Sequence, residues 1–278
     1  MKIVVLTENT LCTDGCDGLH AARGMSLYAE TAGHKVLFDM GPGAEFLRNA
    51  AVLGVDLTAV DTAVLSHGHS DHGGGLAAFC RANARAKIYL RPDALQPHYA
   101  VLPGQEPRSI GLEAPPEPIR ERLVSTGASL RLDEELLLFS DVEDDASLRA
   151  AAPKLQQGTA EGLRPDGFFH EQHLLVEEGG KAALLAGCGH LGIVNTLRAA
   201  ERHLGRRPDV VFGGFHLFEL EPGTPEAERL TAVTAAALSE GGAVYHTGHC
   251  TGDWAYARLK ETLGDRLRPM ACGTAAEL

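Results

Sequence analysis

The stretch Ser66-His67-Gly68-His69-Ser70-Asp71-His72-Gly73-Gly74-Gly75 determines how the rest of the chain is interpreted. It follows the apolar run 62–65, which is typical of a buried strand, and it precedes a helical pattern over 76–83. His67 and His69 are two residues apart, so at the end of a strand their side chains project to the same side. Imidazoles crowded at a strand-to-helix corner predict a metal site.

The turn after His69 allows Asp71 and His72 to fold back toward the first two histidines. Neutral imidazole nitrogen together with carboxylate oxygen suits zinc, with manganese, iron or nickel as alternatives. Four ligands at this spacing do not all reach one tetrahedral ion comfortably. We therefore expect two divalent ions, one held by His67 and His69 and the other by Asp71 and His72. The alternative is a surface loop that is merely rich in His and Asp.

Composition limits the classes of partner. The chain has 278 residues, of which 44% are hydrophobic, and this permits a sizeable core in one large domain or two small ones. A formal net charge of −12, without a run of Lys or Arg, argues against nucleic acid and anionic membranes. The amino-terminal segment 1–8 is too soon polar for a signal peptide, and no apolar run approaches the length of a membrane span. We expect a cytoplasmic protein with a small-molecule substrate, six reduced cysteines and an oligomeric state that the sequence does not indicate.

Later strand ends repeat the strand-then-histidine pattern. The first gives Gly187-Cys188-Gly189-His190 before a helical stretch, and we predict His190 as a metal ligand. Cys188 would be a soft thiolate ligand to zinc, and a small buried residue is the alternative. The next strand ends in Gly213-Gly214-Phe215-His216-Leu217, which makes His216 a further candidate. His173 could also ligate, but packing within its strand is the favoured interpretation.

The last core strand ends in His246-Thr247-Gly248-His249-Cys250-Thr251-Gly252. His246 continues the side-chain alternation of the strand, which favours a structural role. His249 follows Gly248, where the chain can turn and direct the imidazole toward a metal. We therefore predict that His249 is the ligand of this pair.

The pattern His-x-His-x-Asp-His between an apolar strand and a Gly-rich helix start resembles the metallo-β-lactamase-fold superfamily. The segment 39–43, Asp-Met-Gly-Pro-Gly, resembles the Asp-x-Gly turn of that superfamily, where turn and ligand-orienting roles are compatible. The resemblance implies an α/β fold: an αββα sandwich of two packed mixed sheets with outer helices, in a single domain over 1–278. Seven of the fourteen prolines fall within 92–118, which predicts an irregular insertion near 92–135 that could act as a lid. His98 and Tyr99 in this insertion are either substrate contacts or an exposed loop pair.

The motifs at 187–196, 213–217 and 246–252 resemble, more narrowly, the branch that includes 7,8-dihydropterin-6-methyl-4-(β-D-ribofuranosyl)aminobenzene 5′-phosphate synthase. This resemblance implies either metal-dependent hydrolysis or pterin-type transfer with loss of pyrophosphate, on a small phosphorylated substrate. Asp71 and His216 are the expected catalytic residues, and no organic cofactor is expected. The expected metal ligands are His67, His69, Asp71, His72, Cys188, His190 and His249. Arg23 stands where many relatives have a histidine, so a substrate role for that position is in doubt.

Two alternatives belong to other functional classes. Diiron flavoprotein oxidases of the superfamily have a glutamate where this chain has His69, which argues against oxygen reduction. A non-catalytic, metal-dependent ligand-binding or sensor protein is the second alternative. The intact set of ligand residues argues against it, and turnover of test substrates would discriminate.

Overall fold

The computed structural model describes residues 1–278, apart from the side chain of Pro118, and the chain forms two compact units. Unit 1 comprises Met1–Gly127, Ala152–Gln172 and Ala271–Leu278, and unit 2 comprises Ala128–Ala151 and His173–Met270. Each unit contains a mixed sheet of seven strands with its own helices. That both units form a single domain stays a prediction.

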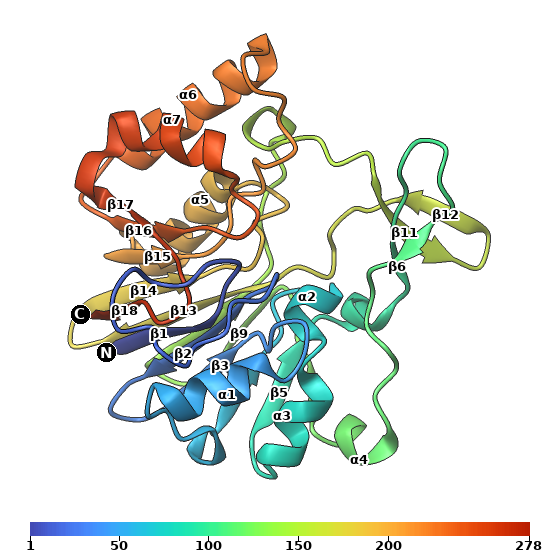
Figure 1. The fold of residues 1–278 in the computed structure, drawn as a ribbon, viewed down its shortest axis with the longest axis vertical. Coiled ribbons are helices and arrows are strands. Elements are labelled where there is room, and N and C mark those ends of the chain that lie inside the picture. The colour runs from blue at the N-terminus through green and yellow to red at the C-terminus, as the bar shows by residue number, and fades with distance from the viewer. The chain divides into compact units, whose positions relative to one another are not determined.

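The sheet of unit 1 has the strand order β18-β1-β2-β3-β4-β5-β8. The strands from β18 to β3 pair antiparallel, whereas β3, β4, β5 and β8 run parallel. Because β1 and β18 are neighbours, both ends of the chain lie side by side (Figure 1). The strands are β1 (Lys2–Thr7), β2 (Ser26–Glu30), β3 (Lys35–Phe38), β4 (Thr62–Val64), β5 (Lys87–Leu90), β8 (Leu123–Ser125) and β18 (Ala275–Glu277).

Helices α1 (Glu45–Val52) and α3 (Leu76–Ala82) cover one face of this sheet (Figure 1). Phe46 of α1 and Phe79 of α3 are fully buried among apolar strand residues such as Leu37. This burial follows from the helical spacing of apolar residues in both segments. Two further helices are single turns, α2 (Ser70–Gly73) and α4 (Glu117–Arg120), and two 3₁₀ turns are η1 (Leu57–Ala59) and η2 (Pro92–Leu95).

The proline-rich insertion is more regular than the sequence predicted. It contributes two strands to a separate four-stranded sheet in unit 1, with the order β12-β11-β6-β7. Prolines are tolerated there because these strands are short and lie at turns and sheet edges. The expectation of an irregular excursion was therefore wrong over this part of the segment. The strands are β6 (His98–Ala100), β7 (Arg108–Ser109), β11 (Leu155–Thr159) and β12 (Gly162–Pro165).

The sheet of unit 2 has the strand order β17-β16-β15-β14-β13-β10-β9. Strands β13 and β14 form a hairpin, whose turn residues Gly179 and Gly180 have φ values of 59° and 77°. Strands β14 to β17 are parallel. The strands are β9 (Ser129–Arg131), β10 (Leu136–Phe139), β13 (His173–Glu178), β14 (Lys181–Leu185), β15 (Val210–Phe212), β16 (Val244–Thr247) and β17 (Leu267–Pro269).

Three helices of unit 2 bury apolar side chains in one core with its strands. They are α5 (Ile193–Leu204), α6 (Pro225–Ser239) and α7 (Asp253–Leu263), with the 3₁₀ turns η3 (Ala146–Leu148) and η4 (Gly264–Arg266). Thr224 caps α6 by accepting a hydrogen bond from the Ala227 N–H, and Pro225 occupies the first turn, where its missing N–H costs nothing. Carboxyl ends of parallel strands meet at one edge of a sheet, so the loops after β14, β15 and β16 converge within this unit.

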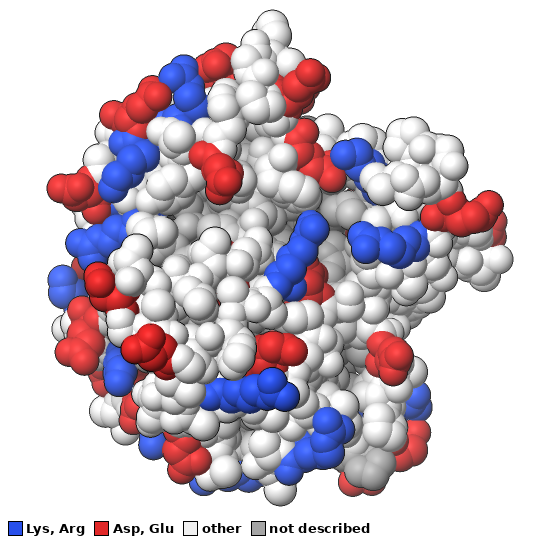
Figure 2. All heavy atoms as spheres, in the orientation of Figure 1, with Lys and Arg blue, Asp and Glu red and all other residues white. Residues whose placement is uncertain are grey.

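Charged side chains of both signs are interspersed over the face of the molecule that Figure 2 shows. Among the described residues, no helix is long and apolar enough to cross a membrane.

Candidate metal centre

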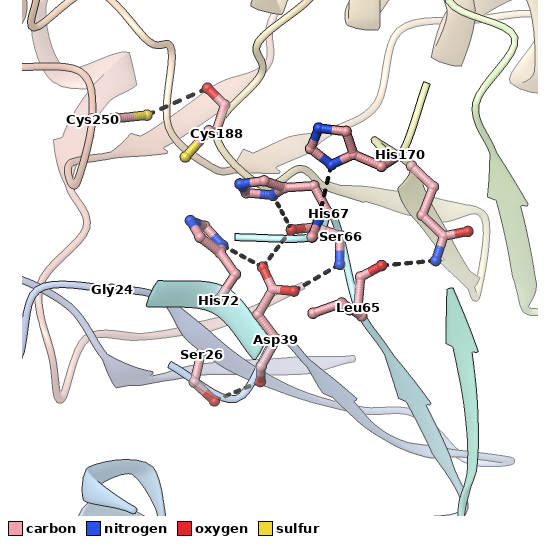
Figure 3. Close-up of polar contacts among 12 residues, drawn as sticks. Gly24, Ser26, Asp39, Leu65, Ser66, His67, His72, His170, Cys188 and Cys250 are labelled. Atoms are coloured by element: carbon pink, nitrogen blue, oxygen red, sulfur yellow. Dashed lines mark hydrogen bonds and ion pairs between the residues drawn. The ribbon is translucent and has the colours of Figure 1, made fainter. Parts of the chain in front are cut away.

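Asp39 anchors the histidine loop of unit 1. Its carboxylate is fully buried; Oδ1 accepts from the Ser66 N–H at 2.7 Å, and Oδ2 accepts from the Ser66 hydroxyl at 2.6 Å. The same Oδ2 lies 2.6 Å from His72 Nδ1, and Ser66 Oγ lies 2.8 Å from His67 Nδ1 (Figure 3). One carboxylate therefore fixes His72 directly and His67 through a serine.

The hydrogen-bond partners in this network determine which ring nitrogens of His67 and His72 carry protons. A carboxylate can only accept, so the Ser66 hydroxyl gives its single proton to Asp39 and must accept one from His67 Nδ1. His72 Nδ1 likewise donates to Asp39. In a neutral ring that is protonated on Nδ1, Nε2 is the nitrogen that can bind a metal. A carboxylate or hydroxyl on the opposite ring nitrogen is the arrangement that orients metal-binding histidines.

His69 is brought close to the other two histidines. Its ring centroid lies 4.6 Å from that of His67, and the centroids of His67 and His72 are 4.1 Å apart. Burial lowers the pKa of His69 well below its ordinary value, the charge of His170 acts in the same direction, and that of Asp71 acts against them. His69 is therefore neutral at pH 7, as a metal ligand must be. Asp71 lies in the single turn α2 and is partly exposed.

A second buried network supports the backbone between His67 and His69. His170 Nδ1 accepts from the Gly68 N–H at 2.9 Å, and its Nε2 lies 3.2 Å from Asp166 Oδ2. His98 Nδ1 lies 3.0 Å from the same oxygen, while His98 Nε2 faces the Asp93 carbonyl at 3.1 Å. His98 is fully buried, so the expectation of an exposed loop pair was wrong for this residue.

In this network, too, the hydrogen-bond partners indicate which ring nitrogen carries a proton. A backbone N–H can only donate, so His170 carries its proton on Nε2 and gives it to Asp166. Both ring nitrogens of His98 face oxygens that only accept, one from the Asp166 carboxylate and one from the Asp93 carbonyl, so this ring is held between two acceptors. Burial would raise the pKa of Asp166, but the hydrogen bonds from His170 and His98 lower it well below its ordinary range. This network is satisfied internally, and it holds Gly68, where a Cβ would lie 2.4 Å from the Ala94 carbonyl oxygen.

In unit 2 the loops after β15 and β16 are joined by hydrogen bonds. The N–H groups of Leu217 and Phe218 donate to the Cys250 carbonyl at 3.0 and 3.1 Å. The Phe215 N–H donates to the Thr251 hydroxyl at 3.0 Å. Because each loop restrains the other, His216 and His249 are held at neighbouring strand ends.

Backbone strain coincides with these loops. Four non-glycine residues in the described part of the chain have positive φ: Asp39, Phe168, His216 and His249. Three of them belong to the two clusters. Such conformations cost free energy of about 1–3 kcal/mol each and gather at functional sites.

The loops of unit 2 gather thiols and imidazoles. One ligand atom each from Cys188, His190 and His216 lie within 4.8 Å of one another, and so do those from Cys188, His249 and Cys250. The rings of His190 and His216 have centroids 4.3 Å apart. Burial raises the pKa of Cys250, but hydrogen bonding to Cys188 and His216 and the charge of His249 bring it well below its ordinary value. This donor set fits zinc, which binds thiolate and imidazole.

Two other buried histidines of unit 2 lie in apolar surroundings. His173 has a pKa of about 3 because it is buried, and its ring packs 5.2 Å from Phe139. His246 stacks flat on Phe212 at 4.3 Å, and burial, with the charge of Arg268, lowers its pKa to about 4. These contacts favour the packing roles that the sequence suggested for both.

The structure thus brings together His67, His69 and His72 in unit 1, and Cys188, His190, His216 and His249 in unit 2. Sequence reasoning did not identify Cys250 as a site residue, although it adjoins His249. It also missed Asp166 and His170, which lie in a loop remote in sequence from 66–75.

Comparison with known proteins identifies the class. The model of the metallo-beta-lactamase superfamily matches residues 23–190, so the chain belongs to this superfamily. Its α/β fold, predicted from the sequence, is confirmed by the solved structure of Tm1679, a metal-dependent hydrolase of the beta-lactamase superfamily. That structure has a TM-score of 0.82 and 24% identity, over 100% of this chain and 99% of the other.

The names of two further similar proteins state an activity or a bound metal. A 7,8-dihydropterin-6-methyl-4-(beta-D-ribofuranosyl)-aminobenzene-5′-phosphate synthase of Methanocaldococcus jannaschii is 27% identical over 232 residues, covering 78% of this chain and 76% of the relative. Zn²⁺-bound PqqB from Methylobacterium extorquens has a TM-score of 0.57 and 13% identity, with 100% of both chains covered. The membership of the predicted superfamily is confirmed, and so is the similarity to the dihydropterin-related synthase.

Proposed function

We propose that this protein is a metal-dependent enzyme that uses two divalent ions, with zinc favoured and manganese, iron or nickel as alternatives. The observation that carries the proposal is the Asp39 network, which holds Nδ1 of His67 and His72 by hydrogen bonds and so orients both rings to bind a metal through Nε2. Its proposed ligands are His67, His69, Asp71 and His72 in unit 1 and Cys188, His190 and His249 in unit 2. The zinc-bound relative supports the choice of metal.

Residues of the two clusters would have different roles in the reaction. Bound divalent ions would polarise a phosphoryl or carbonyl oxygen and favour ionisation of an attacking water. Asp71 would orient the attacking group and accept its proton, since it is the partly exposed carboxylate of the histidine loop. His216 would donate a proton to the leaving group. Hydrolysis and transfer with loss of pyrophosphate differ in which nucleophile attacks.

We infer a small phosphorylated substrate. The support is the phosphate-containing product named for the M. jannaschii relative. The ring of Phe218 packs edge-on to His216 at 5.4 Å and is 43% exposed, which offers an apolar surface beside the proposed proton donor. A planar substrate could pack on such a ring.

Metal analysis of protein purified without added metal tests the first part of the proposal, with two ions per chain as the expected result. A panel of phosphodiesters, phosphomonoesters, pyrophosphates, esters and lactones tests the second. His67→Gln should remove activity, while His20→Gln on the exposed surface should not. Two bound ions without turnover across the panel and with dihydropterin pyrophosphate would favour a non-catalytic binding protein.

A further inference from the structure

We propose that Cys250 is a metal ligand and that, with Cys188, it gives unit 2 a two-thiolate site for a zinc-class ion. This proposal rests on the proposed function, because it adds a ligand to the metal centre inferred above. It also changes the expected chemistry of that centre, from a site with one thiolate to a site with two.

The first support is proximity. The ligand atoms of Cys188, His249 and Cys250 lie within 4.8 Å of one another. Ligand atoms around a tetrahedral zinc ion lie about 3.5 Å apart, given zinc–sulfur and zinc–nitrogen bonds of about 2.3 and 2.0 Å. Small side-chain rotations therefore suffice to close the set around an ion.

The second support is the space reserved for the sulfur. A Cβ on Gly214 would lie 2.3 Å from Cys250 Sγ, so no larger residue fits opposite this thiol. Gly214 and Cys250 lie in the two loops that hydrogen bonds join, and both cysteines are buried. The thiol is thus held at a defined position among the histidines.

The third support is the chemistry of the donors. Cys250 Sγ lies 3.4 Å from the Cys188 carbonyl oxygen and donates to it (Figure 3). Metal binding requires the thiolate, so a sulfur–metal bond replaces this hydrogen bond when an ion binds. Two thiolates and an imidazole favour zinc or cobalt over magnesium, calcium or manganese, which prefer oxygen ligands.

Cobalt substitution of the whole protein tests this proposal without reference to turnover. Thiolate bound to Co²⁺ gives an intense near-ultraviolet charge-transfer band, and its intensity rises with the number of thiolates. We expect Cys250→Ser to lose about half of the band and Cys188→Ser a similar share, because each removes one sulfur donor. The matched control is Cys80→Ser, which removes a thiol of helix α3 in unit 1 and should leave the band unchanged.

A second variant displaces the thiol without removing it. Gly214→Ala puts a methyl group against Cys250 Sγ, whereas Gly242→Ala adds one where no atom lies within 4 Å. Only Gly214→Ala should reduce the band and weaken cobalt binding. If Cys250→Ser binds cobalt with an unchanged band, this inference is overturned and the proposed function stands. If the wild-type protein binds no divalent ion, both fail.

Discussion

The two histidine clusters are positioned by different physical means. In unit 1 a buried carboxylate, Asp39, receives hydrogen bonds from the residues that flank and form the histidine loop. In unit 2 the loops after β15 and β16 are joined through main-chain groups, and His216 and His249 adopt positive φ. Side-chain charge therefore orients the first cluster, and backbone geometry orients the second. Substitutions should separate the two.

The largest effect is expected for Asp39→Asn. The amide cannot accept from all three donors that the carboxylate serves; hydrogen bonds to charged groups contribute about 1.5–3 kcal/mol each, so losing more than one costs about 3–5 kcal/mol. We expect a loss of stability in this range and metal affinity lowered about 10–100-fold, as for other residues that orient ligands. Urea unfolding and metal titration measure the two effects.

The same variant tests the contrast between the units. The cobalt–thiolate band, which reports on unit 2, should persist in Asp39→Asn while total cobalt falls. Asp17→Asn, at an exposed position, is the control for the charge change. If the band and the total metal content fall in proportion, the two clusters do not act separately.

Asp166→Asn should have the next largest effect. Asp166 Oδ2 accepts from both His98 and His170, and hydrogen bonds to charged groups contribute about 1.5–3 kcal/mol. We expect about 2–3 kcal/mol of destabilisation, with weaker metal binding because His170 no longer fixes Gly68. Chemical unfolding of this variant beside Glu161→Gln, an exposed carboxylate nearby in sequence, checks the estimate. An effect no larger than that of the control would contradict it.

Local sequence signals predicted much of the fold. Apolar runs bounded by glycine identified the strands, and the motif at 66–75 identified three histidines that the structure does bring together. The insertion was misjudged because prolines indicate an irregular backbone, whereas β6 obtains its hydrogen bonds from β11, more than fifty residues later. Cys250 was missed for a related reason. Its neighbours Gly214 and Cys188 lie in other loops, and no local pattern reveals such a contact.

His173 provides a test of a buried histidine outside both clusters. Burial lowers its pKa to about 3 in the folded state, below the ordinary value of 6.5. As pH falls below 6.5 the unfolded chain binds the proton first, so folding stability is lost as pH falls from about 6.5 toward 3. Between pH 7 and pH 5 this should cost about 2 kcal/mol.

His173→Leu should remove that part of the pH dependence while preserving most of the packing against Phe139. Unfolding free energies at pH 7 and pH 5 measure the change, with His20→Leu as the exposed control. An unchanged pH dependence in His173→Leu would show that this ring accepts a proton without cost in the folded protein, against the apolar surroundings described above.

The smallest effect separates His246 from His249 within unit 2. His246 is buried and stacks on Phe212 with an interplanar angle of 4°, so its ring packs within the sheet. His246→Gln should lose this contact at a cost of about 1 kcal/mol, typical of an aromatic pair, and the protein should keep its full metal content.

His249 has a φ of 47° and its ligand atom lies near the sulfurs of Cys188 and Cys250. His249→Gln should therefore keep the fold but lower the occupancy of one ion and remove most activity. Melting temperature and metal content of both variants show which histidine binds the metal. If His246→Gln lost metal while His249→Gln kept it, the roles of the two histidines would be exchanged.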